Sequence, residues 1–214
     1  MVETGDADAF ITGIHSGTAE ITELAKKIIG IREPYKHFAA FNIVTGKRGT
    51  FFFADTRINR YPSTDVLIDV ALLANDAVKS YAMKPVIAML SHSNFGADRV
   101  GSPRSVHDVV EYIHKNHPDV VIDGEMQVSF ALDKKLRDEV YPFNKLKGKD
   151  VNTLVFPNLT AANSAYRLLG KLSDMETIGP VQVGLNKSVH FTEMESSARD
   201  ILNLTTVAVV NAIV

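Results

Sequence analysis

Three polar residues suited to anion binding follow the apolar run 85–90, namely Ser91, Ser93 and Asn94. The run is expected to be a buried strand, and ligands of open α/β sheets lie outside the carboxyl ends of the strands. Hydroxyl and backbone N–H groups at such a point can cradle a phosphate or a carboxylate. The loop 91–102 is long enough to suggest a function. An ordinary surface loop is the alternative, and the residues alone leave both open.

Carboxylates follow a second expected strand end, where Asp123 and Glu125 come after the run 120–122. Two carboxylates there could do acid–base chemistry or hold a cation, or they could form a turn and a helix cap. At a third strand end, Asn158 is expected to cap the helix that follows. Glycines near the fourth, such as Gly184, indicate close approach of the backbone to a ligand or to a neighbouring helix.

The histidines do not form a convincing metal site. His107 and His114 are two helical turns apart, but His117 precedes Pro118 outside the expected helix, and no carboxylate completes the set. We expect these histidines on a solvated face and predict no metal ion in this chain. The GxGxxG, P-loop and GxSxG patterns are also absent from the sequence, so the common nucleotide and acyl-hydrolase signatures are missing.

The elements that must position these residues alternate between strands and helices. A hairpin is expected around residues 46–49, because glycine supplies the positive φ that tight turns need. This hairpin should be the one antiparallel element. The other strands should pair mostly in parallel, with helices on both faces of a layered α/β sheet. The expected strands span residues 9–13, 38–44, 50–54, 85–90, 120–122, 153–156 and 178–183. The expected helices span residues 18–29, 63–80, 158–172 and 196–209, and one more begins at Ser102-Pro103.

Composition narrows the functional classes. The 214 residues include 23 Lys+Arg and 25 Asp+Glu, which gives a net charge of −2 and argues against general nucleic-acid binding. No cysteine is present, so thiolate catalysis and cysteine-ligated metals are excluded, and a reducing compartment is indicated. The sequence has no apolar run of membrane-spanning length and no signal-peptide pattern, which favours a cytoplasmic protein without a membrane partner. Residues 1–214 are expected to form one domain, possibly with two intimate subdomains.

Eight short runs, in order and with similar spacing, resemble the phosphate acetyltransferase/phosphate butyryltransferase family. The resemblance implies the phosphotransacetylase fold, which is similar to isocitrate and isopropylmalate dehydrogenases, and it implies a further third of chain before residue 7. The runs are Ala7-Asp8-Ala9 with Gly13, Phe53-Ala54-Asp55 with Asn59 and Pro62, Ala88-Met89-Leu90-Ser91 with Ser93, Pro118-Asp119, Ile122-Asp123-Gly124-Glu125 with Gln127, Phe156-Pro157-Asn158-Leu159 with Asn163 and Tyr166, Gly179-Pro180 with Gly184, and Lys187 with Val189.

A finer resemblance is to the acetyltransferase-like C-terminal domain of bacterial NADP-dependent malic enzymes. It is carried by the run from Ser91 to Gly96, by Val189-His190, and by the closing run from Arg199 to Asn203. Active acetyltransferases usually have phenylalanine, threonine and lysine at the positions of His92, Asn94 and Phe95.

The family's active site is altered in this chain. The resemblance aligns Glu193 and Met194 with the family's Ser-Arg pair and Glu23 with another family arginine, while the later acid is kept as Asp200. Arginines neutralise the phosphate of acetyl phosphate, and losing one preorganised donor typically costs about 10²–10³ in rate. The two carboxylates are expected to add repulsion. The resemblance therefore implies that transferase activity is weak or lost.

Binding of coenzyme A is expected to survive. Arg167 and Lys171 lie one turn apart, where the family uses basic residues near the nucleotide, and an exposed basic pair is the alternative. The ligand residues implied are Ser91, Ser93, Asn94, Arg167, Lys171 and Asp200.

The resemblance implies a regulatory and oligomerisation domain that senses acetyl-CoA and forms a homo-oligomer. It also implies a malic-enzyme domain in cis, which would hold NADP and a divalent metal, with no cofactor in the present domain. The alternatives are an active phosphate acetyl- or butyryltransferase, and a domain that only dimerises.

Overall fold

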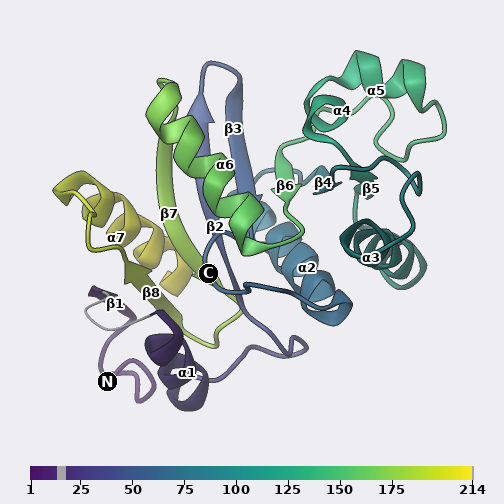
Figure 1. Ribbon diagram of the computed structural model, residues 1–214. Helices are drawn as coiled ribbons and strands as arrows, with labels where there is room; N and C mark the ends of the chain where they lie inside the picture. The colour runs from purple at the N-terminus through teal and green to yellow at the C-terminus, as the bar shows by residue number, and fades with distance from the viewer. Residues whose placement is uncertain (14–17, 214) are drawn as a thin grey trace.

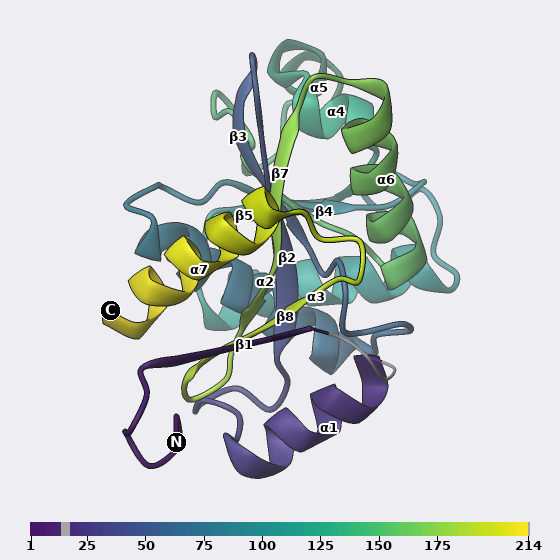
Figure 2. The same ribbon diagram turned by 90° about the vertical axis from the view of Figure 1, so that its left-hand side faces the viewer.

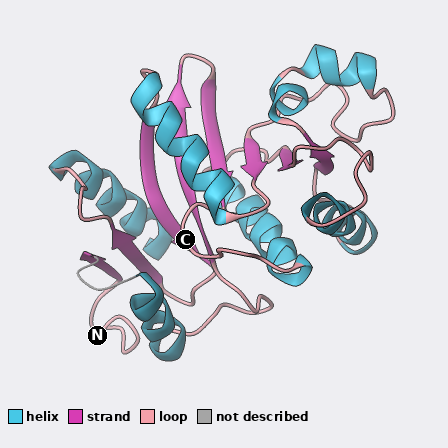
Figure 3. Cartoon of the chain, viewed as in Figure 1, coloured by secondary structure: helices cyan, strands magenta, loops and turns pink. Residues whose placement is uncertain are grey.

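The computed structural model describes residues 1–13 and 18–213, which form two β-sheets and their covering helices (Figures 1 and 3). The larger sheet has six strands in the order β5-β4-β6-β3-β2-β7, and the smaller pairs β1 with β8. The strands are β1 (Ala9–Gly13), β2 (Ala39–Gly46), β3 (Gly49–Ala54), β4 (Ile87–Leu90), β5 (Ile122–Met126), β6 (Thr153–Val155), β7 (Glu176–Val183) and β8 (Ser188–Thr192). The helices are α1 (Thr18–Ile28), α2 (Thr64–Ser80), α3 (Ser102–Asn116), α4 (Val128–Leu132), α5 (Lys134–Val140), α6 (Leu159–Leu172) and α7 (Ala198–Ile213).

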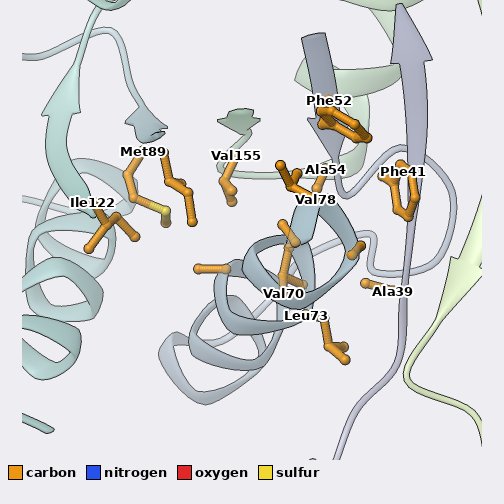
Figure 4. Packing of buried hydrophobic residues seen from close by; sticks show 14 of the residues in the cluster. Ala39, Phe41, Phe52, Ala54, Val70, Leu73, Val78, Met89, Ile122 and Val155 are labelled. Carbon is orange, nitrogen blue, oxygen red and sulfur yellow. The ribbon is translucent and has the colours of Figure 1, made fainter. Parts of the chain in front are cut away.

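Alternation along β2 and β3 gives the larger sheet two apolar faces. Phe41 and Phe52 belong to a core that includes side chains of α2 and α3, whereas Val44 and Phe53 belong to a second core with α4 and α6. Successive residues of a strand point to opposite faces, which explains the division. Figure 4 shows Phe41 and Phe52 above the apolar side of α2, and α6 crosses the opposite face in Figure 1. The expected α/β fold with helices on both faces is therefore confirmed.

The larger sheet is mixed. Strand β2 runs antiparallel to both of its neighbours, β3 and β7, while the remaining neighbours pair in parallel. The expected hairpin is present, but the prediction that it is the one antiparallel element is wrong. Because the hairpin reverses β2 relative to the other strands, β7 must also pair with β2 in the antiparallel sense.

Local signals set the starts of two long helices. The Ser63 side chain accepts a hydrogen bond from the Val66 N–H and caps α2, and the Asn158 side chain accepts one from the Ala161 N–H and caps α6. Both caps satisfy an N–H group that has no partner within its helix. At the start of α3, Gly101 takes the capping position, and the helix begins at Ser102-Pro103 as expected.

The smaller sheet packs against α1 and α7. Phe38, Val189 and Phe191 form a third apolar core with Ala25 of α1, and α7 contacts both β1 and β8. Figure 2 shows α1 below this sheet and α7 above it. The fold therefore places the end of β8 beside the larger sheet, where the connection to α7 extends toward α6.

Candidate functional site

The carboxylate of Glu193, directly after β8, is held by donors from two other segments. Oε1 accepts hydrogen bonds from Arg57 Nη1 at 2.8 Å, Arg167 Nη2 at 3.0 Å and the Tyr166 hydroxyl at 3.3 Å, and Oε2 accepts one from Arg167 Nη2 at 2.9 Å. The side chain of Glu193 is 16% exposed, that of Arg57 19% and that of Arg167 47%. We call Glu193, Arg57, Tyr166 and Arg167 the Glu193 clamp.

Asp55 fixes the loop that carries Arg57. Its Oδ1 accepts hydrogen bonds from the backbone N–H groups of Ala40, Arg57 and Ile58, and its Oδ2 accepts from the backbone and side-chain nitrogens of Asn59. Burial raises the pKa of Asp55, and the hydrogen bonds from the backbone oppose that rise. The run Phe53-Ala54-Asp55 with Asn59 therefore builds a rigid loop, and residue 57 is positioned by it.

One face of α6 supplies the other two donors. Arg167 Nε donates to Asn163 Oδ1 at 3.1 Å, and the guanidinium lies 5.5 Å from the centre of the Tyr166 ring. The spacing of three and four residues puts these side chains on one side of the helix. Burial raises the pKa of the Tyr166 hydroxyl, and the negative charge of Glu193 raises it further.

Of the predicted site residues, the Glu193 clamp contains two, Glu193 and Arg167. Glu23 is exposed on α1 and pairs with Lys26 at 2.9 Å, and Met194 is 79% exposed. Lys171 is exposed in the last turn of α6. Asp200 accepts hydrogen bonds from the backbone and hydroxyl of Ser197 at the start of α7. Ligand roles for these residues stay predictions.

Arg57 is the functional residue that sequence reasoning missed. Arg57 lies between Asp55 and Asn59 of a family run, which could have marked it as a candidate site residue. Nothing in the sequence connects it with Glu193, 136 positions away. The carboxylate of Glu193 is paired with two guanidinium groups, and the expected repulsion of phosphate stays a prediction. The guanidinium of Arg57 lies beside residue 193. It comes from a segment in which the resemblance implies no arginine.

The loop after β4 is shaped by the end of β5. Glu125 Oε1 accepts hydrogen bonds from the Gly96 N–H at 2.7 Å and the Ser93 hydroxyl at 3.2 Å, while Asn94 Oδ1 accepts from the Gln127 N–H at 2.9 Å. The hydroxyl of Ser91 accepts from the Ser93 N–H. These bonds explain the loop's shape, and anion binding by Ser91, Ser93 and Asn94 stays a prediction.

Asp123 and Glu125 are buried within β5, which continues to Met126. The expected strand end at residue 122 is therefore wrong. Asp123 accepts hydrogen bonds from the backbone of Lys145 and Gly124, and burial raises its pKa. Both carboxylates hold remote segments in place, which explains why the chain keeps them inside a strand.

The histidines of α3 pack toward β5 and are not on the solvated face that was expected. His107 Nδ1 lies 3.6 Å from Glu125 Oε2, and His114 Nε2 lies 2.8 Å from the backbone oxygen of Ile122. Among residues 1–13 and 18–213, no three histidine, cysteine or acidic side chains gather as metal ligands would. Within the same residues, no helix combines the length and apolar character needed to cross a membrane.

A separate cavity of about 330 Å³ lies between α2, β7 and the start of β8. Its lining includes Arg32 and Asp76, whose side chains are 3.6 Å apart, together with Lys187 and His190. It meets β8 at Ser188, the opposite end of the strand from Glu193, so it is distinct from the Glu193 clamp.

Comparison with known sequences finds relatives of this chain in two classes of protein, malic enzymes and phosphate acetyltransferases. The family model described as phosphate acetyl/butaryl transferase matches residues 1–209. The NADP-dependent malic enzyme of Salmonella typhimurium is 36% identical over 214 residues, which are 99% of this chain and 28% of that protein. The phosphate acetyltransferase of Bacillus subtilis is 30% identical over 213 residues, which are 100% of this chain and 66% of that protein.

Solved structures of phosphotransacetylases have a fold similar to that of this chain. A phosphotransacetylase from Streptococcus pyogenes has a TM-score of 0.91 and 29% identity, with 99% of this chain and 65% of that one covered. The EutD phosphotransacetylase from Staphylococcus aureus has a TM-score of 0.86 and 26% identity, with 99% and 64% covered. The chain thus spans about two thirds of these phosphotransacetylases and 28% of the malic enzyme from Salmonella typhimurium.

Proposed function

Because the chain belongs to the phosphate acetyl/butaryl transferase family, we propose that it is the acetyltransferase-like regulatory and oligomerisation domain of an NADP-dependent malic enzyme. In this proposal it binds acetyl-CoA, and its own transferase activity is weak or lost. The malic-enzyme chemistry, with NADP and a divalent metal, belongs to a domain in cis. The proposed location is the cytoplasm.

Similarity to malic enzymes supports the parentage. Those of Haemophilus influenzae and Escherichia coli are 34% and 36% identical to this chain, each over 99% of it. The phosphate acetyltransferases of Bacillus subtilis and Mycoplasma capricolum are 30% and 29% identical. The two groups of relatives differ little in identity to this chain, so the choice between their activities depends on the geometry of the site.

The Glu193 clamp is the observation that carries the proposal for activity. The resemblance implies a serine at position 193. In this chain the residue is a glutamate, and its carboxylate accepts hydrogen bonds from Arg57 and Arg167. A phosphate or acyl phosphate would have to displace this carboxylate before two N–H groups of an arginine could grip it. Charge stabilisation accelerates a reaction only when its donors are aimed at the reacting group. The clamp aims them at Glu193.

A domain with weak catalysis can still regulate. Allosteric control requires only that a ligand bind two states of the protein with different affinity. The family fold and the basic residues of α6 are retained, which supports acyl-CoA binding.

A coupled assay with acetyl phosphate and coenzyme A tests the activity. We expect a turnover of about 0.1 per second or less, a hundredfold below the typical enzyme value. The phosphate acetyltransferase of Bacillus subtilis serves as the positive control in the same assay. A turnover of about 10 per second would refute the proposal.

Calorimetry with acetyl-CoA tests the ligand. The protein should bind it, and Lys171→Met should weaken binding, whereas Lys135→Met, an exposed lysine of α5, should not. No heat at millimolar acetyl-CoA would contradict sensing and would favour a domain that only dimerises. Light scattering after size exclusion tests the expected homo-oligomer.

An active phosphate acetyl- or butyryltransferase is the second candidate. It is favoured by the convergence of Arg57 and Arg167, which together place two guanidinium groups at one point. Such a pair could replace the arginines missing at positions 23 and 194. The coupled assay above separates the two candidates.

A further inference from the structure

We propose that Arg57, Tyr166 and Arg167 form a binding site for a small oxyanion, and that Glu193 fills this site as an internal ligand that must leave before an external anion can enter. The proposal rests on the proposed function in one respect, since it takes this site to be part of the ligand-binding region. It adds a regulatory contact that the family pattern does not contain, because the resemblance implies a serine at position 193.

The Glu193 carboxylate uses the surrounding donors unevenly. Oε1 of Glu193 accepts three of the four hydrogen bonds, and Oε2 accepts one. Arg57 Nε is buried and has no hydrogen-bond partner among the residues that the structure describes. Buried donors are normally paired. A tetrahedral oxyanion offers more acceptor oxygens than a carboxylate and suits such a set of donors better.

The charges point in the same direction. The clamp contains two guanidinium groups and one carboxylate, so its formal charge is 2 − 1 = +1. The nearby carboxylate of Glu195 also acts on Arg167 from a distance. A dianion such as hydrogen phosphate would neutralise both arginines directly, whereas Glu193 neutralises only one charge.

Part of the donor set is held in place independently of Glu193. The backbone of Arg57 is fixed by Asp55, and Arg167 Nε is held by Asn163. Glu193 comes from a different segment, and its own backbone is held by a turn with Ser196. Withdrawal of the carboxylate would therefore leave Arg167 and the backbone of residue 57 in place. An incoming anion would then have to take over only the Arg57 guanidinium, whose side-chain hydrogen bond is to Glu193.

Phosphate titrations of the parent protein and three variants test the proposal. Glu193→Gln and Glu193→Ser remove the internal ligand, and Glu111→Gln makes the same charge change as the first on an exposed position of α3. Calorimetry at constant ionic strength, with inorganic phosphate as the probe, should show binding about tenfold tighter or more in both Glu193 variants, because a competing charge-assisted interaction has been removed. Glu111→Gln should behave like the parent protein.

Two further variants secure the result. Adding Arg57→Met to Glu193→Ser should abolish the gain, which assigns the phosphate to this site. Glu193→Asp keeps the charge that the arginines need but shortens the side chain, so it should fold even where the serine variant does not, and it should gain about threefold or more in phosphate affinity since the competitor is weakened.

Unchanged phosphate affinity in folded Glu193 variants would overturn the proposal. An equal gain in Glu111→Gln would overturn it too, because the effect would then be one of net charge, and so would a gain that survives Arg57→Met. Acetyl-CoA is titrated separately in the same proteins. A gain for phosphate without any acetyl-CoA binding would support the internal ligand and refute the proposed sensor, and the reverse pattern would do the opposite.

Discussion

His190 should make the protein less stable in mild acid. The residue is fully buried in β8, where its Nδ1 accepts a hydrogen bond from the Gln182 N–H and its Nε2 lies 3.1 Å from the Ser188 hydroxyl oxygen. That hydroxyl donates to the backbone oxygen of Ala208, so the imidazole proton is on Nε2. Burial lowers the pKa of His190 from 6.5 to about 4.

The sign and size of the effect follow from proton linkage. Between pH 6.5 and pH 4 the unfolded chain binds a proton at His190 that the folded protein does not, so stability falls as the pH falls through this window. With these two pKa values, the loss between pH 7 and pH 5 is about 2 kcal/mol, and the full loss below pH 4 is about 3 kcal/mol.

Urea unfolding followed by far-UV circular dichroism measures this loss, since the chain has no tryptophan. His190→Gln removes the titrating group and keeps a side chain that can donate and accept. We expect the parent protein to lose about 2 kcal/mol more than this variant between pH 7 and pH 5. Equal pH dependence of the parent and His190→Gln would refute the reasoning, as would an NMR titration of His190 near pH 6.5.

Three further substitutions test the packing, each by urea unfolding. Phe52→Ala should destabilise the protein by about 3–5 kcal/mol, because the ring is 2% exposed in the core under α2; a loss under 1 kcal/mol would contradict this packing. Arg137→Met should cost about 2–4 kcal/mol, since its guanidinium is buried and donates to four backbone oxygens, whereas the exposed Lys135→Met should stay within about 0.5 kcal/mol. Gly184→Ala should cost about 3 kcal/mol, as its φ is +94° and an added Cβ would lie 2.9 Å from an α2 side chain. Gly49→Ala, at a φ of +110° in open space, should cost about 1 kcal/mol, and equal losses for the two glycines would argue against the crowding.

Periodicity predicted the elements whose burial is regular. The helix expected over 63–80 is α2, and the helix expected over 158–172 is α6. Each helix begins one residue after its capping residue. Both carry apolar residues on one face and a side chain that caps the first turn, so the information is local. The hairpin near Gly46 is similarly encoded by its own glycines.

Elements held by remote partners were not predictable. Strand β8 is short, and only Val189 and Phe191 among its residues are apolar; His190 is buried there because β1 and α7 enclose it. The helices α4 and α5 fold around Arg137, whose carbonyl partners extend to Lys149. Neither arrangement leaves a periodic apolar pattern in the sequence, because polar groups find their partners only after distant segments have met.

The candidate site shows the same limit in its charges. In the sequence, Glu193 is an anionic residue at a position where the resemblance implies an anion site. Arg57 is a cationic residue in a loop, with no partner that the sequence reveals. Together they form a largely buried ion pair, in which removing one member leaves an uncompensated charge. A mostly buried carboxylate therefore requires its arginine, and neither residue can be interpreted without the other. The sequence alone presents Glu193 as an unpaired carboxylate, whereas in the folded protein it is paired with the guanidinium groups of Arg57 and Arg167.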